Sequence, residues 1–174
     1  MKSSLLESIV SILQGHTPCS SREIEFKKIF LRNADIPLLS KQNTDPGHFT
    51  ASGFVRNPET NKFVFIFHPK FQKWIQPGGH LDESDSHILL AAQREIEEET
   101  GLTDIIWDGT LRLDIHNVPA NSAIGAHQHW DLQFGFLTKQ LHTLGAIHSQ
   151  WFSRSEIQPS ITDDSVLRFV EDWQ

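Results

Sequence analysis

The segment REIEEETGL, residues 94–102, carries four carboxylates close together. On a helix, Glu95, Glu98 and Glu99 are three or four residues apart and share one face, whereas Glu97 points away from them. Like charges on one helix face repel each other, at a cost of about a few tenths of a kcal/mol per pair. A hard divalent cation such as Mg²⁺ reverses this cost, because it binds oxygen and accepts several carboxylates. The face is therefore either solvated or a cation site.

The residues before this segment favour the cation site. PGG at 77–79 permits a sharp turn and offers backbone groups to a ligand. The sequence GGHLDESDSHILLAAQREIEEETGL at residues 78–102 resembles the Nudix box of the Nudix hydrolases, with the box itself at Gly79–Leu102. The usual form of this box is Gly, five residues, Glu, seven residues, then Arg-Glu-apolar-any-Glu-Glu-any-Gly-apolar. The second half, from Arg94, matches fully. The first half has Asp85 in place of the usual Glu and is expanded by one residue.

The resemblance implies hydrolysis of a diphosphate bond in a nucleoside diphosphate linked to another moiety, with water as nucleophile and Mg²⁺ (or Mn²⁺) as cofactor. Such ions neutralise diphosphate oxygens and lower the pKa of bound water. By resemblance, Arg94 would orient a box glutamate through a charge-assisted hydrogen bond. The implied catalytic residues are Glu95, Glu98 and Arg94, and the implied metal ligands are Glu95, Glu98, Glu99, Gly78 and Asp85. A further ligand or base from outside the box is expected at Asp131 or at the distal acid Glu156.

A histidine-rich segment forms a second candidate site. In HQHWDLQF, the two-residue period of a strand puts His127, His129 and Asp131 on one face and apolar residues on the other. Imidazole and carboxylate together suit a transition metal better than Mg²⁺. His80, beside the glycine turn, could complete the set. The alternative is a substrate-facing strand whose histidines bind phosphate or backbone, so both a second metal and a substrate contact remain open.

Two other functions compete with hydrolysis. A non-catalytic nucleotide-binding module would be expected to lose box glutamates, and this chain keeps Glu95, Glu98 and Glu99. Isopentenyl-diphosphate isomerases share the Nudix fold, but their catalytic cysteine is expected in the body of the domain, and Cys19 lies outside it. The expected partner is a small-molecule nucleotide or another diphosphate substrate, and a homodimer is a further expectation.

Composition limits the class of protein. A chain of 174 residues with 38% apolar residues fits one domain with a sizeable core. The formal net charge of −7 disfavours a large nucleic acid as partner. There is no apolar run of membrane-spanning length, and Glu7 interrupts the first apolar stretch, so we expect a cytoplasmic protein without membrane contact.

The pattern of apolar residues predicts the elements that position these groups. Residues 1–46 are expected to form a short N-terminal helical extension packed on the main body, with Ser20 capping its second helix. Residues 47–174 form the expected Nudix hydrolase domain, in which strands surround a helix at 86–100. Its predicted buried stripe is Leu89, Ala92 and Ile96, and a closing helix is expected after Thr162 or Asp163. The predicted class is α/β, a Nudix-like α/β/α sandwich with a mixed curved sheet.

Overall fold

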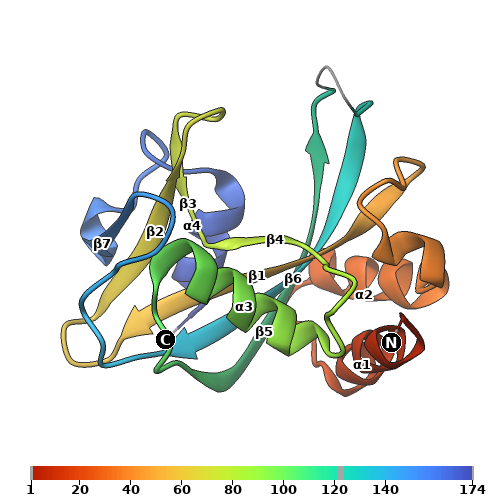
Figure 1. Cartoon of the computed structure of the whole chain (residues 1–174), viewed down its shortest axis with the longest axis horizontal. Coiled ribbons are helices and arrows are strands. Elements are labelled where there is room, and N and C mark those ends of the chain that lie inside the picture. Colours follow the sequence, from red (N-terminus) through yellow and green to blue (C-terminus); the bar gives the residue numbers. More distant parts are fainter. Residues whose placement is uncertain (1, 121–123, 174) are drawn as a thin grey trace. The chain divides into compact units, whose positions relative to one another are not determined.

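The computed structural model describes residues 2–120 and 124–173, with the side chain of Ile36 left aside. The elements, labelled in Figure 1, are α1 (Lys2–Gly15), α2 (Ser21–Asn33), η1 (Ile36–Leu39), β1 (Gly47–Asn57), β2 (Lys62–His68), β3 (Lys73–Ile75), β4 (Gly78–His80), α3 (Ile88–Thr100), β5 (Ile106–Val118), β6 (His127–Leu137), β7 (Ser149–Ser153), η2 (Arg154–Glu156) and α4 (Asp164–Asp172). The strands form a seven-stranded sheet in the order β3-β2-β1-β6-β5, with β4 paired to β1 and β7 to β2. The predicted α/β class and the N-terminal helices are confirmed.

The chain falls into two compact units. Unit 1 comprises Met1–Ala51, Gly79–Ala91 and Leu111–Gln133, and unit 2 comprises Ser52–Gly78, Ala92–Thr110 and Phe134–Gln174. The boundary expected at residue 46 between a helical extension and a catalytic domain stays a prediction.

In unit 1, the N-terminal helices bury one apolar stripe and one carboxylate. Leu5, Ile9 and Leu13 are buried on α1, which contacts α2. Ser20 caps α2 as predicted, because its side chain accepts a hydrogen bond from the amide of Glu23 at 3.1 Å. The Glu23 side chain itself is buried.

The Glu23 carboxylate joins α2 to the preceding turn and to β5. Its oxygens accept from the amides of Cys19, at 2.7 Å, and Leu113, at 2.9 Å, and one oxygen lies 3.0 Å from His16 Nε2. Burial alone would raise the pKa of Glu23, but the hydrogen bonds from His16 and Cys19 lower it overall. This carboxylate therefore stabilises the fold in its charged form.

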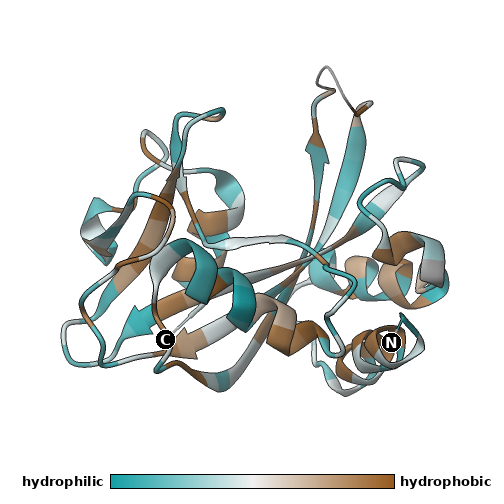
Figure 2. Cartoon of the chain, viewed as in Figure 1, coloured by the Kyte–Doolittle hydropathy of each residue, from teal (hydrophilic) through white to brown (hydrophobic). Residues whose placement is uncertain are grey.

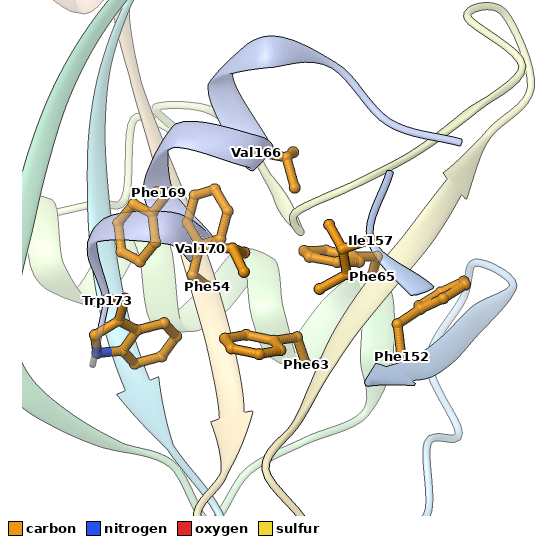
Figure 3. Packing of buried hydrophobic residues seen from close by; sticks show 9 residues of the cluster. All are labelled: Phe54, Phe63, Phe65, Phe152, Ile157, Val166, Phe169, Val170 and Trp173. Atoms are coloured by element: carbon orange, nitrogen blue, oxygen red, sulfur yellow. The ribbon is translucent and has the colours of Figure 1, made fainter. Parts of the chain in front are cut away.

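In unit 2, an aromatic cluster packs α4 against the sheet. Figure 3 shows the side chains of α4 facing Phe54 of β1 and residues of β2 and β7. The rings of Phe54 and Phe169 stack, with centroids 3.7 Å apart and an angle of 3° between their planes. Asp163 caps the helix by accepting from the amide of Val166 at 3.0 Å, which confirms the predicted closing helix.

The helix that carries the glutamates begins at Ile88 and presents apolar residues first and charged residues second, as the hydropathy colours of α3 show (Figure 2). Ala92 and Ile96 are buried as predicted, but Leu89 is only partly buried, so its predicted place in the stripe is wrong. Ile88 and Ala91 are buried instead. Ile88 lies four residues before Ala92 and eight before Ile96, so it belongs to their face, whereas Leu89 is turned about 100° away from Ile88. The helix also starts two residues later than predicted.

Glycine at position 53 lets α3 pack directly on β1. A Cβ atom on Gly53 would lie 2.2 Å from Cδ1 and 2.7 Å from Cγ1 of the fully buried Ile96. A larger residue at this position would force Ile96 out of its present rotamer or move the glutamate helix away from the strand.

Candidate functional site

Arg94 bridges two of the box glutamates. Its Nη1 donates hydrogen bonds to Glu95 Oε1 at 2.8 Å and to Glu98 Oε2 at 3.2 Å. The Glu95 side chain is 13% exposed and that of Glu98 is 57% exposed. One guanidinium thus fixes two carboxylates of different exposure, an arrangement that suits a positioned ligand set better than a freely solvated face.

Glu99, the third glutamate of the face, is partly buried and is held by a backbone amide. Its Oε2 accepts a hydrogen bond from the Gly78 amide at 2.9 Å. Burial raises the pKa of Glu99 to about 7, and the negative charges of Glu95 and Glu98 add to this rise while the Gly78 hydrogen bond opposes it. The three carboxylates therefore repel each other in the absence of a cation. Gly78 presents its amide to this group, and its predicted role as a carbonyl ligand stays a prediction.

The carboxyl end of α3 is held by a loop after β6. The amides of Leu144, Ala146 and Ile147 donate to the carbonyls of Thr100 (2.9 Å), Glu98 (2.9 Å) and Glu99 (3.3 Å). These are carbonyls that a helix end leaves without an intrahelical partner. The helix ends at Gly101, whose φ of 74° is left-handed and whose amide donates to Glu97.

The Gly145 backbone touches the backbone of the glutamate helix. A Cβ at this position would lie 2.2 Å from the carbonyl carbon and oxygen of Glu99 and 2.3 Å from the amide nitrogen of Thr100. This loop had no recognisable signal in the sequence, because its partners lie about forty residues earlier in the chain.

The two outlying acid candidates make local contacts. Asp85, in unit 1, is buried and accepts a hydrogen bond from the Asp82 amide at 2.7 Å. Glu156, in unit 2, accepts from the amide (2.7 Å) and hydroxyl (2.6 Å) of Ser153, and the hydroxyl and amide bonds lower its pKa. Both side chains thus fix their own loops. Their roles as metal ligand and distal acid stay predictions.

Unit 1 contains a cluster of histidines from three strands. Nitrogen atoms of His48 (β1), His80 (β4) and His129 (β6) all lie within 4.8 Å of one another. The ring centroids are 5.0 Å apart for His48 and His80, 4.9 Å for His48 and His129, and 5.2 Å for His80 and His129. His127 stacks on His48 at 4.9 Å.

The structure thus brings together the three histidines named from the sequence and adds His48. The period-two alternation of His48 with Thr50 and Ser52 on β1 is the signal that could have identified it. Asp131 is buried, and its carboxylate accepts from Thr50 Oγ1 at 2.9 Å and from Gln133 Nε2 at 3.1 Å.

Burial favours the neutral form of His48, His80 and His129. Burial lowers the pKa of His80 to about 4 and that of His129 to about 2, with smaller contributions from neighbouring histidines and, for His80, from the charge of Lys41. Burial also lowers the pKa of His48. Neutral imidazole is the form that binds a metal ion.

Comparisons with known sequences and structures identify the class of protein. Residues 46–168 match the family model described as the NUDIX domain, so the chain belongs to the Nudix family. The chain is a hydrolase that acts on pyrophosphate bonds. No curated protein matches it. Among residues 2–120 and 124–173, every helix is too short or too polar to cross a bilayer.

Solved structures share the Nudix-like fold. The Escherichia coli dihydroneopterin triphosphate pyrophosphohydrolase superposes with a TM-score of 0.56 at 10% identity, over 72% of this chain and 93% of that one. A Nudix-family hydrolase from Clostridium perfringens gives 0.51 at 21% identity, over 72% and 94%. The Nudix domain of Shewanella oneidensis NrtR, complexed with ADP ribose, gives 0.51 at 18% identity, over 83% and 94%.

Proposed function

We propose that this chain hydrolyses the diphosphate bond of a nucleoside diphosphate linked to another moiety, using Mg²⁺ (or Mn²⁺) held by Glu95, Glu98 and Glu99. The carrying observation is geometric: Arg94 donates hydrogen bonds to Glu95 and Glu98, and the Gly78 amide donates to Glu99, so all three carboxylates of the face are held by named donors. Burial, and to a smaller extent the charges of Glu95 and Glu98, raise the pKa of the partly buried Glu99. A set of carboxylate oxygens with excess negative charge fits a hard divalent ion.

The residues of this chain have separate tasks in the proposed reaction. When bound, the divalent ion would neutralise diphosphate oxygens and lower the pKa of the attacking water. Arg94 holds Glu95 and Glu98 in fixed rotamers through its two hydrogen bonds. The Gly78 amide does the same for Glu99. Glu95 is then one of the three ligands or the general base that takes the proton from water.

Two observations support the proposed substrate class: the net charge of the chain and the ligand bound in one similar structure. A net charge of −7 supports a small anion bound through a cation rather than a nucleic-acid chain. ADP ribose, present in the Shewanella oneidensis complex, is a nucleoside diphosphate linked to a sugar and belongs in the first set of compounds to test. We further propose that the protein acts in the cytoplasm, where nucleotides and Mg²⁺ are abundant, and that it forms a homodimer, which light scattering can measure.

A panel assay tests the proposal. The purified chain is incubated with nucleotide sugars, ADP ribose, dinucleoside polyphosphates, NADH and (d)NTPs in Mg²⁺ or Mn²⁺, and products are separated by anion-exchange chromatography. Glu98→Gln should lower kcat on the order of 100-fold or more, because it removes a charged oxygen from the ion. Glu97→Gln is the matched control: it removes a charge from the same helix on another face and should keep wild-type turnover.

Two results would refute the assignment. Equal activity of Glu98→Gln and Glu97→Gln would show that the shared glutamate face does not hold the ion. Absence of product from every compound, together with measurable nucleotide binding, would favour a non-catalytic binding module.

A further inference from the structure

The histidine cluster of unit 1 has the composition of a metal site of its own. His48, His80 and His129 come from three strands and converge with nitrogen atoms within 4.8 Å of one another. Around a tetrahedral ion with Zn–N bonds of about 2.0–2.1 Å, ligand nitrogens lie about 3.4 Å apart. Small changes of side-chain torsion are therefore enough to bring the three nitrogens onto one ion.

The hydrogen bond that His48 makes through Nδ1 leaves its Nε2 atom available to a ligand. Its Nδ1 lies 2.9 Å from the Asn43 carbonyl oxygen, which only accepts, so Nδ1 carries the proton and donates it. The Nε2 atom of the neutral ring then has a lone pair. A backbone carbonyl that fixes the tautomer of a histidine is the usual support of a metal-binding imidazole.

Two of the nitrogens are buried without a hydrogen bond. Within residues 2–120 and 124–173, neither His48 Nε2 nor His129 Nε2 has a partner. A buried polar atom without a partner costs about 1–3 kcal/mol, so such atoms in a folded chain call for an explanation. A metal ion shared by both rings would give His48 Nε2, and His129 Nε2 in the tautomer that leaves it unprotonated, the partner that each lacks.

The same tautomer argues against a phosphate group at this position. Phosphate oxygens are acceptors, and an unprotonated Nε2 is also an acceptor, so His48 would repel the group that a substrate contact requires. Mg²⁺ is also disfavoured, because it prefers oxygen ligands. Imidazole nitrogens suit Zn²⁺ and its neighbours among the transition metals.

We propose that His48, His80 and His129 bind one transition-metal ion of the Zn²⁺ class, at a site that shares no ligand with the glutamates of α3. Three protein ligands leave a fourth tetrahedral position for water or a substrate oxygen. His127, stacked on His48, supports the ring without being one of the three ligands. The proposal does not depend on the proposed hydrolysis.

Metal titration of the full chain tests the site. The protein is stripped with a chelator, and Zn²⁺ binding is measured by isothermal titration calorimetry with excess Mg²⁺ present to occupy carboxylate sites. We expect one tight Zn²⁺ per chain. His80→Asn and His129→Asn should each raise the Kd at least about 10-fold, since the loss of even a supporting residue of a metal ligand has this effect.

Two control variants separate this site from other sources of binding. His142→Asn removes an exposed histidine outside the cluster, and Glu98→Gln alters the glutamate face; both should bind Zn²⁺ like the wild type. His80 is exposed, so His80→Asn is expected to fold, which far-UV circular dichroism verifies. Co²⁺ provides a second readout, because a tetrahedral site gives strong visible absorption that His80→Asn should lose.

The proposal is overturned if His80→Asn and His129→Asn bind Zn²⁺ as tightly as the wild type. It is also overturned if Glu98→Gln, rather than the histidine variants, abolishes the tight binding.

Discussion

Gly145→Ala provides a test of how the glutamate helix is held. In the wild type, Gly145 lies against the backbone of Glu99 and Thr100, and its neighbours Leu144, Ala146 and Ile147 hydrogen-bond the helix end. The added methyl would overlap backbone atoms at 2.2 Å, which cannot rotate away as a side chain can. Either the loop must lift from the helix or the helix end must move.

The two responses have similar costs. If the loop lifts, three hydrogen bonds of 2.9, 2.9 and 3.3 Å are lost, at about 1 kcal/mol net for each. If the helix moves, overpacking costs about 1–3 kcal/mol. We therefore expect a loss of roughly 2–4 kcal/mol in the free energy of unfolding, or about 5–15 °C in Tm for a chain of this size. The side chain of Leu144 is 89% exposed, so the loop is the part that gives way more easily.

Thermal unfolding and turnover on the substrate found by the panel measure the effect. Turnover should fall together with stability, because the turn that carries Glu98 and Glu99 loses the loop amides that hold its carbonyls. The matched control is Gly15→Ala, at the end of α1, where an added Cβ meets nothing within 4 Å. If Gly145→Ala has the Tm and kcat of Gly15→Ala, the loop does not position the glutamates.

Three further substitutions test other contacts. Gly53→Ala should destabilise the chain by about 1–3 kcal/mol, measured by urea unfolding, because its methyl overlaps the buried Ile96; an unchanged midpoint would contradict the packing. Glu23→Gln should cost about 1–3 kcal/mol at pH 7 because it weakens the acceptor of the Leu113 amide. The folded pKa of Glu23 is lowered from 4.5, so its stabilisation is present above that pH and lost as pH falls through the folded pKa. The variant should therefore have a shallower Tm decline below pH 5, and a parallel decline would refute this role. Arg94→Lys keeps the positive charge but loses the planar guanidinium that contacts Glu95 and Glu98, and it should lower kcat on the order of 10-fold. A wild-type kcat in this variant would show that Arg94 does not position the glutamates.

The glutamate face could be predicted from local sequence because helical periodicity relates residues that are only three or four positions apart. The cap at Ser20 and the cap at Asp163 are local in the same way, and both are confirmed. Family membership follows from one contiguous segment and a domain match over residues 46–168. The start of α3 is not specified in this way, because the Asp and Ser residues at 82–86 offer several possible caps. The structure buries Ile88 and Ala91 in place of Leu89.

The surroundings of that face depended on long-range contacts that no local pattern specifies. The Gly78 amide reaches Glu99 across 21 residues, and the loop at 144–147 returns to the helix end. The histidine cluster has the same origin. Alternation on one strand grouped His127 and His129, but His48 joined them only through the packing of β1 and β6 in the sheet, and the same packing turned Asp131 toward Thr50.

The sequence by itself determined the class, the helix and the carboxylates that share a face, because these depend on residue type and on the period of one element. The tertiary structure decided which of these carboxylates accepts a backbone amide, which loop holds the end of the helix, and which histidines meet. Those outcomes depend on strand pairing and loop closure between residues far apart in the chain, where the free energy of many weak contacts, rather than any local preference, selects the partners.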